Sequence, residues 1–387
     1  MSEVPESEPL AFGRFFLPGP TEVQPEVLQA QVRPMFGHRG PEMKALMKEL
    51  QGGLKDLFRT DRPVLVSASS ATGLMEAAIR NGVRDRVLCL VNGAFSERFA
   101  EIGQACGKAV DVFEVPWGEA HDPDEVGRRL AEGRHDAVTV VHSETSTGVL
   151  QPLEELARVV AGHEDTLLLV DSVTGVGGAP VLTDAWGLDF VLTGSQKALA
   201  LPPGLALGVA SERMLARAAT LPDRGVYFDL CSYQENVEKH QTPNTPALSL
   251  MHALNAQLAR IRAEGVEARW GRHQAMAERC WSWAEGLGRT VGEGFRVLAA
   301  PGFRSPTVTC IGLPGGLAGP DVAAGMAKRG FVIGGGYGKL KQTTVRIGHM
   351  GDHTVEELDE VLEALEDVLR GLTAREPAVA SAQGARP

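Results

Sequence analysis

Residues 167–200 read LLLVDSVTGVGGAPVLTDAWGLDFVLTGSQKALA and contain two short apolar runs that lead to chargeable side chains. The first run, residues 166–170, ends in Asp171, and the second, residues 190–193, leads to Lys197. Apolar runs of this length predict buried strands. In an open parallel sheet the carboxyl ends of the strands face one crevice, where ligands bind. We therefore expect Asp171 and Lys197 to point into one site.

A carboxylate and a lysine at neighbouring strand ends suit an aldehyde cofactor that contains a pyridine ring. The lysine would form an imine with the aldehyde, and the carboxylate would keep the ring nitrogen protonated. Taken alone, a lysine is usually a solvated surface cation, and an aspartate after an apolar run is often a helix N-cap. The glycines of GVGG at residues 175–178 do not have the spacing of a dinucleotide-binding loop.

Three motifs carry a resemblance to a known family: HSETSTGVLQP at 142–152, LLLVDSVTGVGG at 167–178 and TGSQKALALPPG at 193–204. Together they resemble the class V aminotransferases of fold type I, which use pyridoxal 5'-phosphate (PLP). The most similar branch contains the alanine–glyoxylate and serine–pyruvate or serine–glyoxylate aminotransferases. The resemblance extends from about Phe16 to about Leu369.

The resemblance implies an α/β fold, with a large domain around a mostly parallel, doubly wound sheet and a smaller C-terminal α+β domain. Alternating strand and helix patterns agree with this architecture. We expect the large PLP-binding domain at residues 15–264 and the small domain at 265–372. The terminal segments, 1–14 and 373–387, have compositions typical of disorder. Residues 225–241 are predicted to form a loop.

Composition limits the classes of function. The 387-residue chain has a net charge of −11, which argues against nucleic acid or an anionic membrane as the main partner. The sequence has no apolar run of about 18 residues and no apolar core of a secretory signal near its start. Its five cysteines form no C-x-x-C pair, which favours free thiols in a reducing cytoplasm over a disulfide or zinc framework.

The resemblance assigns cofactor roles to individual residues. Lys197 would hold PLP, Asp171 would pair with the ring nitrogen, Phe95 would stack on the ring, and Thr145 would contact its substituents. The phosphate would be bound by Ser70, Ala71, Thr72 and Gln196, and by Asn244 and Thr245 of the neighbouring subunit in a homodimer. Small residues between a strand and a helix also predict a phosphate seat at 70–72. Many relatives carry Ser-Gly-His there, which leaves the side-chain roles of Ala71 and Thr72 open.

Substrate binding is assigned first to Arg346. An arginine flanked by apolar strand residues is costly to bury without an anion, and the matching arginine of the family binds the substrate α-carboxylate in a bidentate manner. The arm that contains Gly19 would border the site. His38 and Arg39 are either part of a polar loop or two donors for a distal group of the substrate.

The implied activity moves an amino group from alanine or serine to glyoxylate or pyruvate in two half-reactions, with Lys197 as general acid and base. One alternative is a phosphoserine aminotransferase, because such enzymes bind the substrate phosphate with a His-Arg pair similar to His38 and Arg39. Cysteine desulfuration would need a cysteine on a mobile loop, whereas Cys310 lies in a strand pattern. A non-catalytic binding protein on this scaffold would normally lack the lysine.

Overall fold

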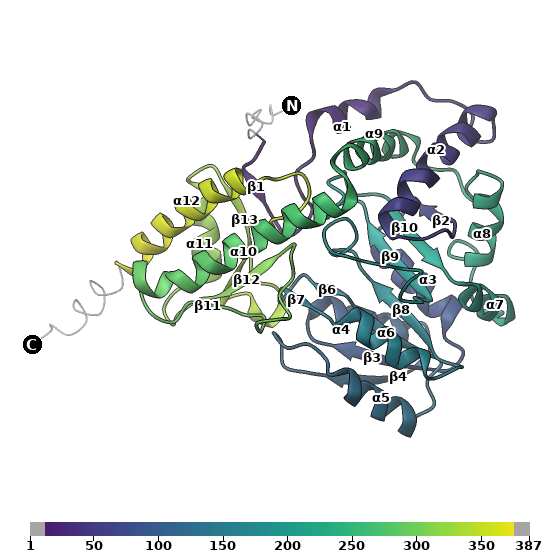
Figure 1. The fold of residues 1–387 in the computed structure, drawn as a ribbon, viewed down its shortest axis with the longest axis horizontal. Helices are drawn as coiled ribbons and strands as arrows, with labels where there is room; N and C mark the ends of the chain where they lie inside the picture. The colour runs from purple at the N-terminus through teal and green to yellow at the C-terminus, as the bar shows by residue number, and fades with distance from the viewer. Residues whose placement is uncertain (1–11, 375–387) are drawn as a thin grey trace, which may run out of the picture.

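A seven-stranded sheet forms the core of the larger part of the molecule (Figure 1). The structure is a computed structural model that describes residues 12–374, so most of the two predicted disordered segments lies outside it. The strands lie in the order β2 (Val64–Ser67), β10 (Ala206–Ala210), β9 (Phe190–Gly194), β8 (Leu167–Asp171), β5 (Ala137–Val141), β3 (Arg86–Val91) and β4 (Ala109–Glu114).

Five neighbouring strands of this sheet, from β9 to β4, run parallel to one another. Strand β10 runs antiparallel to both β9 and β2. The strands from β8 to β10 are buried along their whole length, which explains their continuous apolar sequences. The predicted mostly parallel sheet is therefore confirmed.

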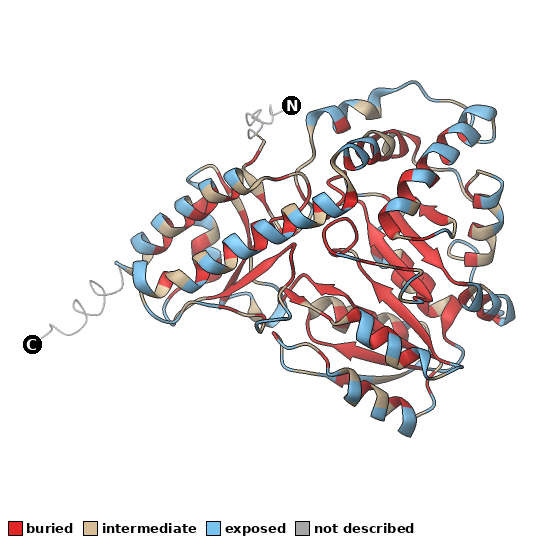
Figure 2. Ribbon diagram, viewed as in Figure 1, coloured by how far each residue is buried: buried red, intermediate tan, exposed pale blue. Residues whose placement is uncertain are grey.

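Helices pack against the sheet and turn their polar faces outward, as Figure 2 shows. Helix α3 (Ala71–Gly82) contacts β8, β9 and β10, and α4 (Ala94–Ala105) contacts β3, β4 and β5. The other helices of this part are α1 (Pro25–Gln29), α2 (Pro41–Phe58), α5 (Pro123–Glu132), α6 (Leu153–Ala161), α7 (Glu212–Thr220), α8 (Leu230–Glu238) and α9 (Leu248–Glu264). The short 3-10 turn η1 (Ala30–Val32) follows α1, and the hairpin strands β6 (Ser143–Glu144) and β7 (Val149–Leu150) follow β5.

A second, five-stranded sheet lies beside the first part (Figure 1). Its order is β1 (Phe15–Phe16), β13 (Val332–Gly335), β14 (Thr344–Ile347), β12 (Thr309–Gly312) and β11 (Arg296–Val297). Helices α10 (Val266–Thr290) and α11 (Gly319–Ala327) pack on it, and α12 (Val355–Thr373) packs against these two helices. The 3-10 turn η2 (Gly338–Leu340) separates β13 from β14. Since β1 pairs with β13, the start of the predicted large domain belongs to the smaller sheet.

The loop predicted at residues 225–241 is wrong, because this stretch contains α8. Leu230, Tyr233 and Val237 are buried at helical spacing. The carboxylate of Asp229 caps the helix by accepting hydrogen bonds from the backbone N–H groups of Cys231 (3.0 Å) and Ser232 (3.4 Å). In the sequence, neighbouring aromatic residues obscure the helical spacing of these three buried residues.

Within residues 12–374, no helix combines the length and the apolar character that crossing a membrane requires.

Candidate active site

Asp171 and Lys197 lie at the carboxyl ends of two adjacent parallel strands. Asp171 is the last residue of β8, and Lys197 follows the end of β9, whose Leu192 is the register partner of Asp171. Both side chains are buried, at 4% and 7% exposure. Each also influences the pKa of the other through charge. The structure therefore brings the two residues into one buried site.

Burial shifts the pKa of both groups toward the neutral form. Desolvation raises the pKa of Asp171 to about 7, although its carboxylate accepts a hydrogen bond from the N–H of Val173 at 2.9 Å. Desolvation lowers the pKa of Lys197 to about 7, and the nearby Arg346 adds to this effect. The Lys197 amine donates to the carbonyl of Pro18. A lysine with such a pKa is partly neutral at neutral pH and can act as a nucleophile.

The arm at residues 15–21 packs directly against the lysine. Thr21 donates from its N–H to the carbonyl of Gln196 (2.9 Å) and from its hydroxyl to the carbonyl of Lys197 (3.0 Å). Gly19 has φ +119°, and a Cβ built on it would lie 2.5 Å from Cε of Lys197. The position therefore requires glycine both for its backbone conformation and for the space that the lysine occupies.

Gly19→Ala will displace the Lys197 side chain and slow its reaction with PLP by about tenfold or more. We expect this because a misplacement of about 1 Å at a reacting group costs up to about 100-fold. The rate of covalent adduct formation measures the effect. Gly107→Ala is the matched control, since Gly107 also has a positive φ (+75°) but no atom within 4 Å of the added Cβ. Equal adduct rates in the two variants would contradict the prediction.

Phe95 lies at the start of α4 and faces the lysine. The Lys197 Nζ is 5.7 Å from the centroid of the Phe95 ring. The ring of Tyr337 stacks on Phe95, with centroids 5.4 Å apart and planes inclined by 25°. Tyr337 belongs to the GGGYG segment at residues 334–338, between β13 and β14.

A buried carboxylate, Glu144, fixes the backbone that carries Phe95. It accepts hydrogen bonds from the N–H groups of Phe95 (3.1 Å) and Ser96 (2.9 Å) at the N-terminus of α4. It also accepts from the N–H (3.0 Å) and the hydroxyl (2.6 Å) of Ser146. A negative charge is favourable at a helix N-terminus. These contacts join residues that lie far apart in the sequence, so they depend on the tertiary structure.

Arg346 offers free donors toward the site. Its side chain is 9% exposed, and it donates to the carbonyls of Gly335 (2.9 Å) and Thr145 (3.2 Å). No carboxylate of the described residues lies within ion-pair distance of it, and its Nη2 forms no hydrogen bond with them. Burial lowers the pKa of this guanidinium. The arrangement suits an external carboxylate. The hydroxyl of Thr145 is paired with that of Thr174 at 2.5 Å.

The first turn of α3 has the properties of an anion-binding turn. Ser70 is the N-cap residue, but its side chain makes no capping hydrogen bond, and Ser70 and Thr72 are exposed. A Cβ built on Gly194 would lie 2.5 Å from Oε1 of Gln196 and 3.2 Å from Cβ of Ala71, so Gln196 lies beside this turn. The N–H groups of a first helical turn lack partners within the helix and attract anions.

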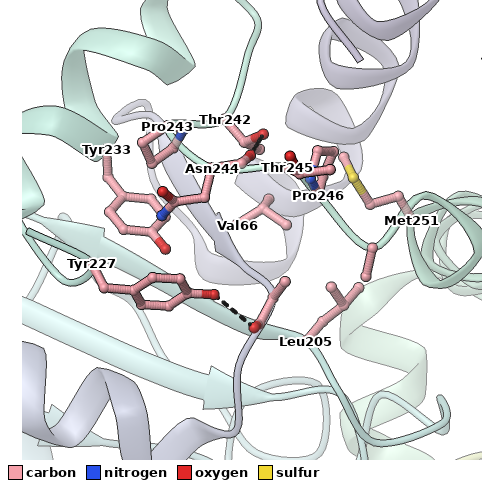
Figure 3. Close-up of a pocket in the computed structure, with 12 residues that line it drawn as sticks. Val66, Leu205, Tyr227, Tyr233, Thr242, Pro243, Asn244, Thr245, Pro246 and Met251 are labelled. Atoms are coloured by element: carbon pink, nitrogen blue, oxygen red, sulfur yellow. Dashed lines mark hydrogen bonds between the residues drawn. The ribbon is translucent and has the colours of Figure 1, made fainter. Parts of the chain in front are cut away.

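Asn244 and Thr245 line a separate pocket together with Tyr227 and Tyr233 (Figure 3). The hydroxyl of Tyr227 donates to the carbonyl of Ala68 at 3.0 Å. Within residues 12–374, Nδ2 of Asn244 is buried without a hydrogen-bond partner, which is costly for an amide. No hydrogen bond of the described part joins Asn244 or Thr245 to Lys197. Their assignment to a neighbouring subunit's site remains a prediction.

Arg39 is engaged elsewhere in the chain. It donates to the carbonyls of Thr242 (2.7 Å) and Pro243 (3.0 Å) and thereby holds the turn that leads to Asn244. His38 is half-buried and forms no hydrogen bond with the described residues. Neither residue contacts Lys197 within one chain, so their substrate role remains a prediction.

Two other residues with potentially reactive side chains, His142 and Cys310, are buried. His142 pairs with the hydroxyl of Ser172 at 3.0 Å, and burial lowers its pKa to about 4, as befits a structural histidine. Cys310 lies inside β12, where burial raises the pKa of its thiol to about 11. Because the thiolate is the reactive form, Cys310 is unsuited to the nucleophilic role that desulfuration requires.

Comparison with known proteins places these features in context. The family model described as aminotransferase class-V matches residues 22–333. The chain is 37% identical over 364 residues to the soluble hydrogenase small subunit of Synechococcus sp., with 92% of each chain covered. It is 32% identical to the L-aspartate–glyoxylate aminotransferase of Paracoccus denitrificans, over 88% of this chain and 86% of the relative. The crystal structure of alanine–glyoxylate aminotransferase from Nostoc sp. superposes with a TM-score of 0.88 at 33% identity, covering 96% of this chain and 98% of that one.

Proposed function

Since this chain belongs to the class V aminotransferases, we propose that it transfers an amino group from alanine or serine to glyoxylate or pyruvate. The observation that carries the proposal is the meeting of Lys197 and Asp171 in one buried site next to the unpaired guanidinium of Arg346. The names of the Paracoccus denitrificans and Nostoc sp. proteins described above include glyoxylate, which supports this acceptor.

The residues present fit PLP. When bound, this cofactor supplies an aldehyde for amino groups and a ring that withdraws electrons. Lys197 offers a partly neutral amine for the aldehyde, and Asp171 offers a carboxylate for the ring nitrogen. Phe95 would face the ring, with Thr145 near its substituents. The first turn of α3 with Ser70, Ala71 and Thr72, together with Gln196, would hold the phosphate.

Three residues of the site then have defined roles in the reaction. Arg346 binds the substrate carboxylate and thereby orients the bond to the α-hydrogen. Lys197 removes the proton from Cα of the substrate and returns it later in the reaction, which requires a pKa near the working pH. Asp171 holds a proton on the ring nitrogen. The burial of all three side chains excludes water from the proton transfer.

We also propose that two subunits share the active sites of a cytoplasmic homodimer. The buried Nδ2 of Asn244 has no partner within the described part of one chain and could donate to the phosphate in the other subunit. Leu28, Val32 and Met35, in and after α1, are 45%, 71% and 68% exposed. Large apolar side chains grouped on a surface favour burial against a second copy.

A donor panel tests the proposed reaction. The cofactor-loaded enzyme is mixed, without an acceptor, with alanine, serine, aspartate or phosphoserine, and its visible absorption is followed. Alanine and serine should bleach this absorption fastest, and glyoxylate or pyruvate should restore it. Bleaching by phosphoserine alone would overturn the choice of donor. Loss of bleaching with every donor would overturn aminotransfer itself.

A further inference from the structure

Four side chains of the candidate site lie next to one another. The amine of Lys197 lies 5.7 Å from the Phe95 ring centroid, which lies 5.4 Å from that of Tyr337. The guanidinium of Arg346 lies 5.4 Å from the Tyr337 centroid and lowers the pKa of Lys197 through its charge. The amine, two aromatic rings and the guanidinium thus form a closed series of neighbours.

Tyr337 is held firmly in this series. Its hydroxyl accepts a hydrogen bond from Nη2 of Arg98 at 3.2 Å, and the guanidinium of Arg98 also lies over the Phe95 ring at 5.0 Å. A Cβ on the preceding Gly336 would collide with the carbonyl of Leu340, which shows how tightly the turn is folded. The phenol ring therefore has a fixed position although 36% of the residue is exposed.

The turn after Tyr337 is also fastened to the larger part of the molecule. Lys339, in η2, forms an ion pair with Glu114 at 3.2 Å and lies 4.1 Å from the ring centroid of Trp117. Tyr337, which follows β13, is thus anchored to α4 through Arg98, while Lys339 is anchored to β4 and the loop after it.

We infer that Tyr337 is a specificity-determining residue whose ring limits the length of the donor side chain. The inference rests on the proposed function. A donor whose carboxylate lies on Arg346 and whose amino group approaches the position of the Lys197 amine must lie inside the closed series. Because the cofactor ring would cover Phe95, the donor side chain then meets the ring of Tyr337. Because Tyr337 is anchored, a longer side chain cannot push it aside without breaking its contact with Arg98.

The test compares donors that differ only in chain length: alanine, 2-aminobutyrate and norvaline, each with glyoxylate as acceptor. In the unmodified holoenzyme, kcat/KM should fall by about tenfold or more from alanine to norvaline, since one methylene is discriminated by about 10-fold to 200-fold. Tyr337→Gly should lower the ratio of kcat/KM for alanine to kcat/KM for norvaline by about tenfold. Tyr337→Phe keeps the ring and should retain most of the preference for alanine.

Phe303→Ala is the matched control, because Phe303 is a comparably exposed aromatic residue (39%) whose hydrogen bonds within residues 12–374 are to the backbone of Leu150 and Ala300. It should leave the ratio of the two kcat/KM values unchanged. If Tyr337→Gly does not bind PLP, Tyr337→Leu replaces it in the comparison of alanine with norvaline, because the leucine side chain still fills part of the position. An unchanged alanine-to-norvaline ratio in the variant that binds PLP would overturn the inference. Failure of the unmodified enzyme to react with any amino acid would instead overturn the proposed function.

Discussion

Replacement of Lys197 with alanine should abolish the covalent adduct with PLP and reduce amino-group transfer by about 10,000-fold. The variant loses both the amine that reacts with the aldehyde and the base that removes the α-proton, and a positioned general base alone contributes about 100-fold to 10,000-fold. Reduction with borohydride followed by peptide mass spectrometry identifies the modified residue. Lys48→Ala, which removes an exposed lysine of α2, should retain the adduct. An adduct on another lysine of Lys197→Ala would refute the assignment.

The pH dependence of adduct formation tests the lowered pKa of Lys197. Burial and the charge of Arg346 lower the pKa of Lys197 to about 7, so its neutral fraction increases as the pH rises through this value. In protein freed of cofactor, the rate of adduct formation should therefore rise up to about pH 7 and level off above it. A solvated lysine would continue to gain reactivity up to about pH 10. A rate that still rises steeply above pH 9 would contradict the effect of burial.

Asp171→Asn should leave the adduct in place but slow the removal of the α-proton by about 100-fold to 1,000-fold. The amide has the size of the carboxylate but no charge to hold a proton on the ring nitrogen, and one lost electrostatic contact in an active site costs about this much. Stopped-flow bleaching with alanine measures the step.

The control for Asp171→Asn is Asp189→Asn. Asp189 is another buried carboxylate, which accepts hydrogen bonds from the N–H of Leu168 (3.0 Å) and the hydroxyl of Ser211 (2.8 Å). This change should lower the free energy of unfolding and leave the rate of bleaching unaffected. If both variants bleached as fast as the unmodified enzyme, the proposed role of Asp171 would be lost.

The sequence predicted the central pair well because local patterns encode it. Asp171 and Lys197 each follow a buried strand, and the direction of parallel strands is enough to bring such positions together. The change from strand to helix likewise locates the first turn of α3, where we propose that the phosphate binds. Arg346 could be recognised because its apolar neighbours in β14 predict its burial.

Other features depend on contacts between distant segments, which no local pattern records. Tyr337 meets Phe95 only because the smaller sheet lies against α4, and the sequence of its turn suggests merely a flexible glycine-rich loop. The hydrogen bonds of Glu144 to the N-terminus of α4 likewise join residues far apart in the chain. For Arg39, the local pattern fits both a substrate donor and the observed contacts with the turn at residues 242–243.

The pairing of β1 with β13 has a consequence for the order of events on the ribosome. Phe15 and Phe16 leave the exit tunnel before the seven-stranded sheet, whereas their partners Val332 and Ile333, and the N–H of Gly348 that donates to the carbonyl of Phe16, are made after it. Pro18 and Gly19, which contact the reactive lysine, directly follow this strand. The native setting of Lys197 is therefore completed only after the whole seven-stranded sheet has emerged.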